Sequence, residues 1–360
     1  MIFHLIDSLG RGGAERVMLE GIHALPDLPH RVLTLHPPHT LASELGDGIV
    51  HHCLGHTGPT TLLRTVRRLR HLIMRDRPAV LHSHLYWSTL ISRLACPAQV
   101  AHVRTIHNMM SKSILETSSL LAGLEFMTRT CKEVSVCVSE AVRRDYADHF
   151  GFPGEAVVIR NAPASRYGIS QTRQPTAGRG LSLVQIGSLR PVKNQWYLLD
   201  VMQQLRDKMV HLDVYGAGPD RERLSERIRK QNLNVRLCGE RPCGPDLMRC
   251  YDLLVAPSLH EGYGMAVAEA MSAGLPVMVS DIPAFREVAG ERALYINPVR
   301  PRSMVGKILA ILDKKIDLVD YLGRGNRNPE GERRRFAHQL RHLYHRLCER
   351  GQAVQVDCLA

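Results

Sequence analysis

The chain has 360 residues, hydrophobic and charged contents of 44% and 23%, and a formal net charge of +12. This composition is typical of a soluble globular protein, the length fits two domains, and no window approaches the roughly 20 apolar residues of a membrane-spanning helix. The positive charge indicates an anionic partner: nucleic acid, acidic lipid or a phosphorylated substrate. Nine cysteines without a CxxC pair indicate reduced cytosolic thiols and argue against a zinc site or a disulfide framework.

The chain opens with an apolar stretch, Ile2–Ile6, which predicts a first strand and has no basic region of a signal peptide. A glycine-rich turn follows and leads into a predicted helix over residues 16–25. Phosphate-binding α/β folds place an anion at such a turn, so Gly12 and Gly13 are candidate ligand contacts. The spacing is not a dinucleotide-binding fingerprint, and a simple tight turn is the alternative.

Residues 61–77 predict a basic amphipathic helix. Its cationic face carries Arg64, Arg67, Arg68 and Arg70, and its apolar residues recur at helical spacing. Such a helix can lie on an anionic membrane surface. The alternative is an ordinary helix that covers a sheet, with its apolar stripe in the core and its arginines in solvent.

Strand and helix patterns then alternate, which predicts βα units and a parallel sheet. The remaining strands of this half are expected at residues 31–35, 49–53, 79–84, 100–106, 134–139 and 157–160. His82 and His84 share one strand face, and we expect core histidines rather than a metal site, since no third ligand is grouped with them. His107 ends a strand at the edge where α/β sheets bind ligands; a capping or core histidine is the alternative.

A polar segment rich in Pro, Gly, Ser and Thr predicts a linker over residues 163–180. We therefore expect a first domain over residues 1–162 and a second over residues 181–328. The final segment predicts a basic helix over residues 329–350, followed by a tail over residues 351–360.

The second domain is expected to open with a strand over residues 181–186, followed closely by Arg190 and Lys193. Cations at this place can neutralise a diphosphate leaving group. Two surface cations at the start of a helix are the alternative. Further strands are expected at residues 211–215, 235–238, 253–256, 276–279 and 293–296.

The most informative stretch, residues 253–281, predicts a strand, a loop, a helix over residues 265–272 and a second strand. Glu261 lies in the loop, and Glu269 lies eight residues later in the helix. The N–H groups of Gly264, Met265 and Ala266 at the helix start can bind an anion. Taken alone, Glu269 could equally belong to a solvated helix face.

The segment from Glu261-Gly262-Tyr263-Gly264 to Glu269 resembles the donor site of the retaining glycosyltransferases of family 4. These have the GT-B fold, an α/β architecture of two facing Rossmann-like domains with parallel sheets and an inter-domain cleft. The loop from Gly12 to Arg16 is similar to the first loop of that family. The loop ending at Lys193 is similar to its Gly-Arg…Lys motif, except that Ser188 stands at the arginine position.

The resemblance implies that Glu261, His107 and Lys193 act in catalysis, with Arg190 as a replacement for the missing arginine. It implies that Glu269 binds the ribose of the nucleotide, while the amides of Gly264 to Ala266 hold the diphosphate. Gly12 and Gly13 would face the donor diphosphate and the acceptor. The terminal helix would cross back onto the first domain.

The implied reaction moves a sugar from a nucleotide-diphosphate sugar, with a UDP-sugar as first choice, to a saccharide acceptor with retention. No bound cofactor is expected, and because no Asp-x-Asp occurs in the chain, basic groups are expected in place of a metal. The net charge, the basic helix and the habit of the family that the chain resembles favour a lipid-linked acceptor in polysaccharide or lipopolysaccharide synthesis, at the inner face of the cytoplasmic membrane and without nucleic acid. A soluble acceptor is the alternative.

Two other functional classes are compatible with the sequence. A nucleotide-sugar epimerase has the same architecture but needs an acid and a base beside the sugar, for which only His107 and Glu261 are candidates. A non-catalytic binding subunit that keeps the fold is favoured slightly by the departure at Ser188.

Overall fold

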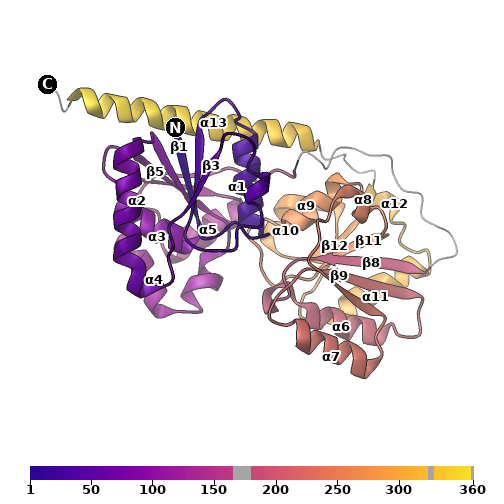
Figure 1. Ribbon diagram of the computed structural model, residues 1–360. Coiled ribbons are helices and arrows are strands. Elements are labelled where there is room, and N and C mark those ends of the chain that lie inside the picture. The colour runs from indigo at the N-terminus through magenta and orange to yellow at the C-terminus, as the bar shows by residue number, and fades with distance from the viewer. Residues whose placement is uncertain (165–179, 323–327, 358–360) are drawn as a thin grey trace. The chain divides into compact units, whose positions relative to one another are not determined.

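The computed structural model (Figure 1) describes residues 1–164, 180–322 and 328–357. Most of the predicted linker, residues 165–179, and the end of the predicted tail, residues 358–360, lie outside the described residues. The chain divides into two compact units. Unit 1 comprises residues 1–162 and 333–360, and unit 2 comprises residues 163–332.

Unit 1 is built on a seven-stranded parallel sheet of order β3-β2-β1-β4-β5-β6-β7. The strands are β1 (Ile2–Ile6), β2 (His30–Thr34), β3 (Val50–Cys53), β4 (Val80–His84), β5 (Ala101–Ile106), β6 (Glu133–Cys137) and β7 (Ala156–Val158). The α-helices are α1 (Gly13–His23), α2 (Leu62–Asp76), α3 (Tyr86–Ala95), α4 (Ser119–Thr128), α5 (Glu140–His149) and the long α13 (Pro329–Asp357). Short helical turns are Ala42–Glu44, Pro59–Thr61 and a π-helical turn at Ser111–Leu115.

Unit 2 has a six-stranded parallel sheet of order β10-β9-β8-β11-β12-β13. The strands are β8 (Leu181–Ile186), β9 (Val210–Tyr215), β10 (Val235–Gly239), β11 (Leu253–Ala256), β12 (Val277–Ser280) and β13 (Leu294–Ile296). The α-helices are α6 (Gln195–Gln204), α7 (Arg221–Gln231), α8 (Pro245–Met248), α9 (Met265–Ser272), α10 (Pro283–Ala289), α11 (Pro301–Leu312) and α12 (Val319–Leu322). Turns of 3-10 helix lie at Pro191–Lys193 and Gly290–Arg292.

The alternation of strands and helices predicted from the sequence is confirmed, because both units are parallel α/β sheets. Strands of such sheets are covered on both faces and therefore read as apolar runs. In unit 1, alternate residues of β1 enter two different cores. Phe3 and Leu5 pack with α2 and α3, while Ile6 packs with α1.

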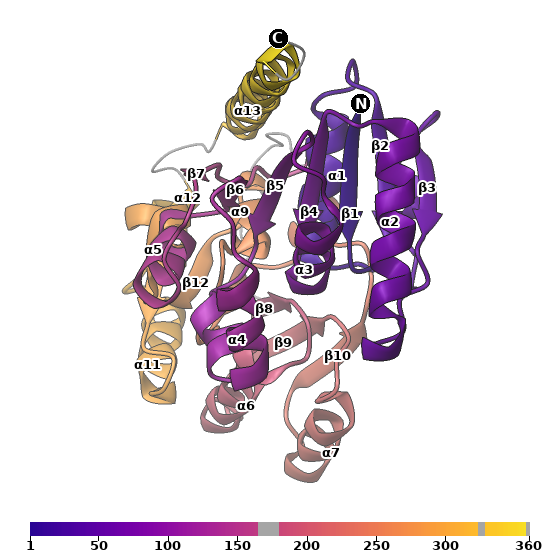
Figure 2. The ribbon, with the colours of Figure 1, turned by 90° about the vertical axis from the view of Figure 1, so that its left-hand side faces the viewer.

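Helix α13 packs on unit 1 although it lies at the other end of the sequence (Figures 1 and 2). Its Phe336 and Leu340 contact Gly21 of α1. The hydroxyl of Tyr344 lies 2.7 Å from Nδ1 of His82 on β4. The helix continues beyond the expected end at residue 350 as far as Asp357.

The basic helix α2 uses its apolar stripe in the core of unit 1, where Leu69 and Ile73 are buried. Leu63 and Met74 nevertheless remain exposed on its outer surface. Across the described residues, no helix combines the length and the apolar content that crossing a bilayer requires.

Candidate functional site

Lys193 and Glu261 lie together at the carboxyl edge of the sheet of unit 2. Lys193 ends the turn after β8, Glu261 follows the neighbouring strand β11, and their Nζ and Oε1 atoms are 2.6 Å apart. Ser258 Oγ donates a 2.8 Å hydrogen bond to the same carboxylate oxygen. The two side chains are 25% and 14% exposed, so a ligand can reach both the cation and the carboxylate.

Hydrogen bonds between the two loops hold this pair in place. Asn194, next to Lys193, donates through Nδ2 to the carbonyl oxygens of Pro257, at 3.1 Å, and Pro298, at 2.8 Å. The backbone N–H of Leu259 also donates to the carbonyl oxygen of Val192, at 2.9 Å. The position of Lys193 relative to Glu261 is therefore fixed by the loops as well as by their own ion pair.

Helix α9 begins beside Glu261, and Gly264 is its N-cap with a φ of +99°. A Cβ at Gly264 would lie 2.7 Å from the Phe285 ring, so both the backbone angle and the space require glycine. Met265 and Ala266 form the first turn, whose N–H groups lack intrahelical acceptors. Glu269 is only 9% exposed, so the alternative of a solvated helix face is wrong.

Arg190 is exposed at the start of the turn that carries Lys193. Within the described ranges, its guanidinium takes part in no hydrogen bond or ion pair, so it is free to move toward an anion. Its neighbour Ser188 is partly buried, and its carbonyl oxygen accepts a 3.0 Å hydrogen bond from Gln195 Nε2. Ser188 thus stands two residues before an exposed arginine.

In unit 1, Gly12 and Gly13 lie at the start of α1, where Gly12 is the N-cap. Helix α1 begins at Gly13, whereas the sequence predicts a start at residue 16. A Cβ at Gly12 would come within 2.2 Å of the Glu15 carboxylate, so glycine leaves room for that side chain. The glycine loop therefore accommodates a buried carboxyl group.

Glu15 and its neighbour Asp7 were not among the residues expected at the site. Burial, with a further contribution from Asp7, raises the pKa of Glu15 to about 7. Burial also raises the pKa of Asp7, which accepts hydrogen bonds from N and Oγ of Ser88 at 2.9 and 2.6 Å. The Gly-Gly-Ala-Glu order contains Glu15, but only the fold shows that Asp7 faces it.

His107 follows β5 as predicted, at the carboxyl edge of the sheet of unit 1. Its Nε2 lies 3.2 Å from Nδ1 of His84 on the adjacent strand β4. The surroundings desolvate the ring and lower the pKa of His107 to about 3, so the imidazole is neutral at pH 7. A neutral imidazole can accept or donate a hydrogen bond to a hydroxyl group of a ligand.

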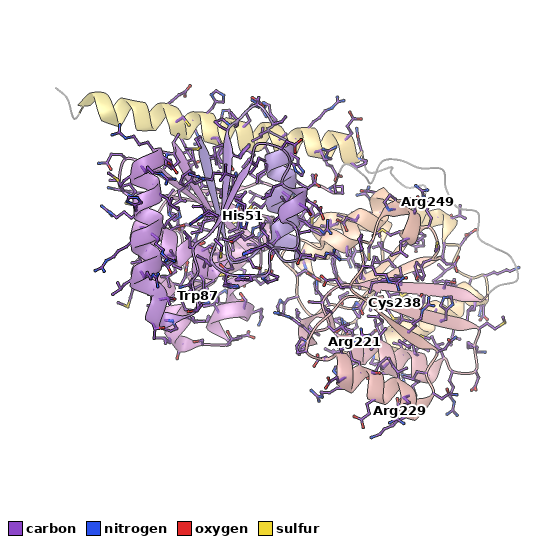
Figure 3. All side chains as sticks on the ribbon, in the orientation of Figure 1. His51, Trp87, Arg221, Arg229, Cys238 and Arg249 are labelled. Atoms are coloured by element: carbon purple, nitrogen blue, oxygen red, sulfur yellow. The ribbon has the colours of Figure 1, made fainter. Side chains whose placement is uncertain are left out.

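Open hollows lie on each unit, and Figure 3 labels Arg221, Arg229 and Trp87 beside two of them. A hollow of about 420 Å³ lies along α7, between Arg221 and Arg229, among side chains of that one helix. A hollow of about 400 Å³ in unit 1 is lined by His36, His56 and Trp87, which follow β2, β3 and β4. The second lies at the strand ends, where α/β sheets bind ligands. The sequence signal for it is a tryptophan just after a predicted strand.

Comparison with known sequences assigns both units. Residues 180–314 match the family described as Glycosyl transferases group 1, and residues 11–162 match Glycosyltransferase Family 4. The chain belongs to these glycosyltransferases. The putative glycosyltransferase EpsF of Bacillus subtilis is 24% identical over 309 residues, which is 78% of this chain and 79% of EpsF.

A second relative of this glycosyltransferase is an Escherichia coli enzyme, UDP-Gal:alpha-D-GlcNAc-diphosphoundecaprenol alpha-1,3-galactosyltransferase. The two are 25% identical over 246 residues, covering 61% of this chain and 62% of the relative. Among solved structures, Anabaena HepE in complex with UDP and glucose has a TM-score of 0.73 at 17% identity, covering 100% of this chain and 99% of HepE. The GT-B fold predicted from the sequence is confirmed.

Proposed function

We propose that this glycosyltransferase transfers a hexose, with retention and without a metal, from a UDP-sugar to a lipid-linked saccharide. The observation that carries the proposal is the Lys193–Glu261 pair beside the start of α9. A cation and helix N–H groups suit a diphosphate, while carboxylates suit sugar and ribose hydroxyls. Both kinds of group therefore occur together at one sheet edge.

The proposed reaction breaks the bond between the anomeric carbon and the diphosphate oxygen while the acceptor oxygen bonds to that carbon from the same face. The acceptor proton passes to the departing diphosphate, so no side-chain nucleophile is required. Lys193, with Arg190 and the amides of Met265 and Ala266, stabilises the charge on the leaving group. Glu261 holds the donor sugar, and Glu269 binds the ribose.

The choice of a UDP-sugar rests on similarity. HepE is a structural neighbour in complex with UDP and glucose, and the E. coli relative is named for UDP-galactose. The lipid-linked acceptor is supported by that relative's name, which gives a diphosphoundecaprenol saccharide. The hollow around Trp87 suits the acceptor sugar, because an aromatic ring can pack against the apolar face of a sugar while imidazoles bond to its hydroxyls.

For membrane contact, α2 offers Arg64, Arg67 and Arg70, which are exposed beside the exposed Leu63. Arg68 is already engaged, since it donates a 2.8 Å hydrogen bond to the carbonyl oxygen of Leu54. Cations next to an exposed apolar side chain favour binding to an anionic leaflet at the inner face of the cytoplasmic membrane.

The donor site is tested by thermal-shift measurements with UDP, GDP, ADP, TDP and their sugar conjugates. We expect stabilisation by UDP and one UDP-sugar, weakened in Lys193→Ala and Glu269→Ala. Lys208→Ala, which removes an exposed lysine of the same unit, is the control and should respond as the wild type does. Equal responses from all variants would contradict the donor site.

Turnover then separates this function from an epimerase and from a binding subunit. We expect release of UDP only when acceptor is present, and a kcat about 10²-fold lower in Lys193→Ala. Isomerised sugar nucleotide without acceptor would instead show an epimerase, and ligand binding without turnover a binding subunit. Turnover that EDTA abolishes and Mg²⁺ restores would overturn metal independence.

Sedimentation with anionic vesicles tests membrane contact. We expect binding at low salt that weakens as salt increases, and a loss of binding when Arg64, Arg67 and Arg70 are replaced together by glutamine. Neutral vesicles are the control. No binding to anionic vesicles at moderate salt would remove membrane contact while leaving the donor site intact.

A further inference from the structure

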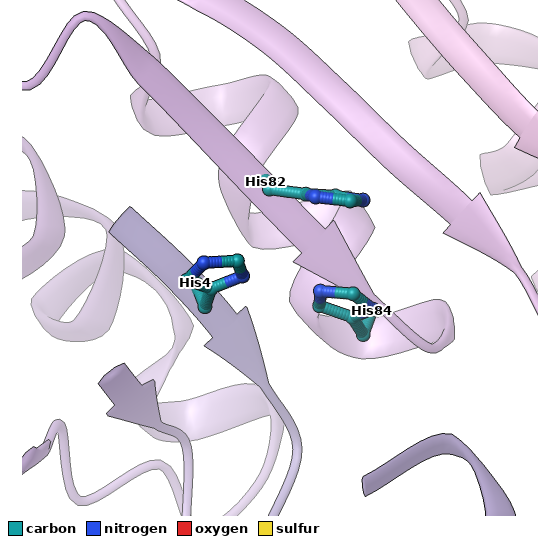
Figure 4. A group of neighbouring side chains, drawn as sticks. All are labelled: His4, His82 and His84. Carbon is teal, nitrogen blue, oxygen red and sulfur yellow. The ribbon is translucent and has the colours of Figure 1, made fainter. Parts of the chain in front are cut away.

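Three histidines meet on one face of the sheet of unit 1 (Figure 4). His4 on β1 pairs directly with His82 on β4, and His84 lies two residues further on the same face. One nitrogen from each ring lies within 4.8 Å of the others. All three are at most 3% exposed, so the cluster is closed to solvent. The sequence shows the pair on β4 but not that strand order brings His4 beside it.

The proton positions on His4 follow from a chain of hydrogen bonds. His30 Nε2 lies 2.9 Å from the carbonyl oxygen of Leu25, which can only accept, so this nitrogen carries the proton. In the neutral ring, His30 Nδ1 must then accept, and the His4 Nε2 atom 3.0 Å away must donate. The remaining nitrogen, His4 Nδ1, therefore presents a lone pair. It is buried and has no hydrogen-bond partner within the described residues.

Two further buried polar atoms, His84 Nε2 and Asn161 Oδ1, are without a hydrogen-bond partner in the part of the chain that the structure describes. A cavity of about 20 Å³ is lined by His4, His82, His84 and Asn161, among others. Buried polar atoms without partners are rare and require an explanation. Here the three residues that carry such atoms line one small space, which is large enough for one ion or one water molecule.

The other ring nitrogens are held from outside the cluster. His30 contacts His4, and His107 Nε2 lies 3.2 Å from His84 Nδ1. In metal sites, the second nitrogen of each ligating histidine usually donates to such a partner, which orients the ring.

We propose that His4, His82 and His84 bind one divalent transition-metal cation of the Zn²⁺ type. Imidazole nitrogens suit Zn²⁺, Co²⁺ and Ni²⁺, whereas Mg²⁺ and Ca²⁺ prefer oxygen. Asn161, which lines the same cavity and has an unpartnered Oδ1 among the described residues, would supply a further ligand. His82 Nδ1 and Nε2 lie 2.7 Å from the hydroxyls of Tyr344 and Thr105, so one of these contacts gives way to the cation.

Such a cation has a structural role, because substrates cannot reach residues this buried. It would link β1 to β4 beneath α13, next to Tyr344. This inference is independent of the proposed transferase activity, since none of the three histidines is assigned to the donor site.

The test uses the full chain expressed in minimal medium supplemented with Co²⁺, because a buried site fills as the protein folds. We expect about one equivalent of Co²⁺ per chain after treatment with EDTA, with the visible absorption bands of nitrogen-ligated Co²⁺. His4→Gln and His84→Gln should each weaken retention more than 100-fold, beyond the 10- to 100-fold loss typical of outer partners. His52→Gln, on the exposed side of β3, is the control and should retain the metal.

Metal below a tenth of an equivalent in folded wild-type protein, or equal retention in His4→Gln and wild type, would overturn the proposal. A water molecule between these side chains in a crystal structure of protein grown with Co²⁺ would do the same. If a variant fails to fold, the stoichiometry and the spectrum of the wild type still decide the question.

Discussion

The cores of the two units differ in chemistry although their sheets have the same architecture. The strands of unit 1 bury charged and polar side chains, among them His4, His82, His102, Arg104 and Glu133. Unit 2 is filled mainly by leucine, valine and methionine. Its conspicuous charged pair, Lys193 and Glu261, lies at the sheet edge instead.

One buried part of the unit 1 core is a network of two arginines and two glutamates. Arg93 and Arg104 each form ion pairs with both Glu125 and Glu133, at 2.6 to 2.8 Å, and all four side chains are 2% exposed. Tyr146 donates a 2.6 Å hydrogen bond to Glu125. The stability of such a charged core depends on the presence of every partner and on pH. The stability of an aliphatic core depends instead on how completely its side chains fill the available volume. Four changes in unit 1, at three buried polar residues and one exposed leucine, test its side of the comparison.

Arg104→Leu should have the largest effect, a loss of about 3–5 kcal/mol of unfolding free energy, because it leaves two buried carboxylates to one arginine. Urea unfolding at pH 7 measures it. Adding Glu125→Leu should recover part of the loss, since the uncompensated charge is then removed. A loss below about 1 kcal/mol would show that the network contributes little.

Glu15→Gln should stabilise the protein at pH 8 by about 3 kcal/mol, the free energy that corresponds to a pKa of about 7 against the ordinary 4.5. The unfolded chain ionises above pH 4.5 while the folded protein keeps its proton until about pH 7, so the wild type loses stability as the pH rises between these values. Unfolding curves at pH 4 and pH 8 measure this. The variant should match the wild type at pH 4, and equal stability at pH 8 would contradict the raised pKa.

His102→Gln tests the loss of stability at acid pH. Burial lowers the pKa of His102 to about 4, so the unfolded chain takes up a proton below pH 6.5 before the folded protein does. Stability is therefore lost as the pH falls from 6.5, by about 2 kcal/mol at pH 5 from this residue alone. Unfolding curves of the variant should fall less steeply by that amount. His52→Gln, at an exposed histidine, should leave the loss of stability at acid pH unchanged. If His102→Gln also leaves it unchanged, the lowered pKa of His102 is wrong.

Leu63→Ser should have the smallest effect, within about 0.5 kcal/mol, because this side chain is 69% exposed on α2. The same unfolding assay measures it. Leu69→Ser, on the buried stripe of the same helix, is the matched contrast and should destabilise strongly. Similar losses from both changes would mean that the outer surface of α2 is covered.

The sequence predicts most of the fold because short strand patterns alternate with helical patterns along the chain, even where the strands of unit 1 carry buried polar residues. Helix α9 has the predicted bounds, Met265–Ser272, since Gly264 and Gly274 mark its two ends. Lys193 and Glu261 were each expected at a strand end. Their 2.6 Å contact follows only from the adjacency of β8 and β11.

Features that depend on strand order could not be predicted. His4 meets His82 because β1 lies beside β4, and no local pattern reports this pairing. The buried pairing of Arg104 with Glu125 joins a strand to a helix later in the chain, where each residue alone suggests a solvated charge. Asp7 and Glu15 lie on either side of the glycine turn between β1 and α1, so their interaction depends on how that turn folds and not on strand order.

Helix α13 has a consequence for the order in which the protein matures during synthesis. The ribosome releases the strands of unit 1 first, yet the helix that covers α1 and His82 is encoded after the whole of unit 2. Until that helix emerges, the nascent amino-terminal half exposes apolar surface opposite Phe336 and Leu340. A stop codon near residue 330 would therefore damage the half of the protein that was translated first.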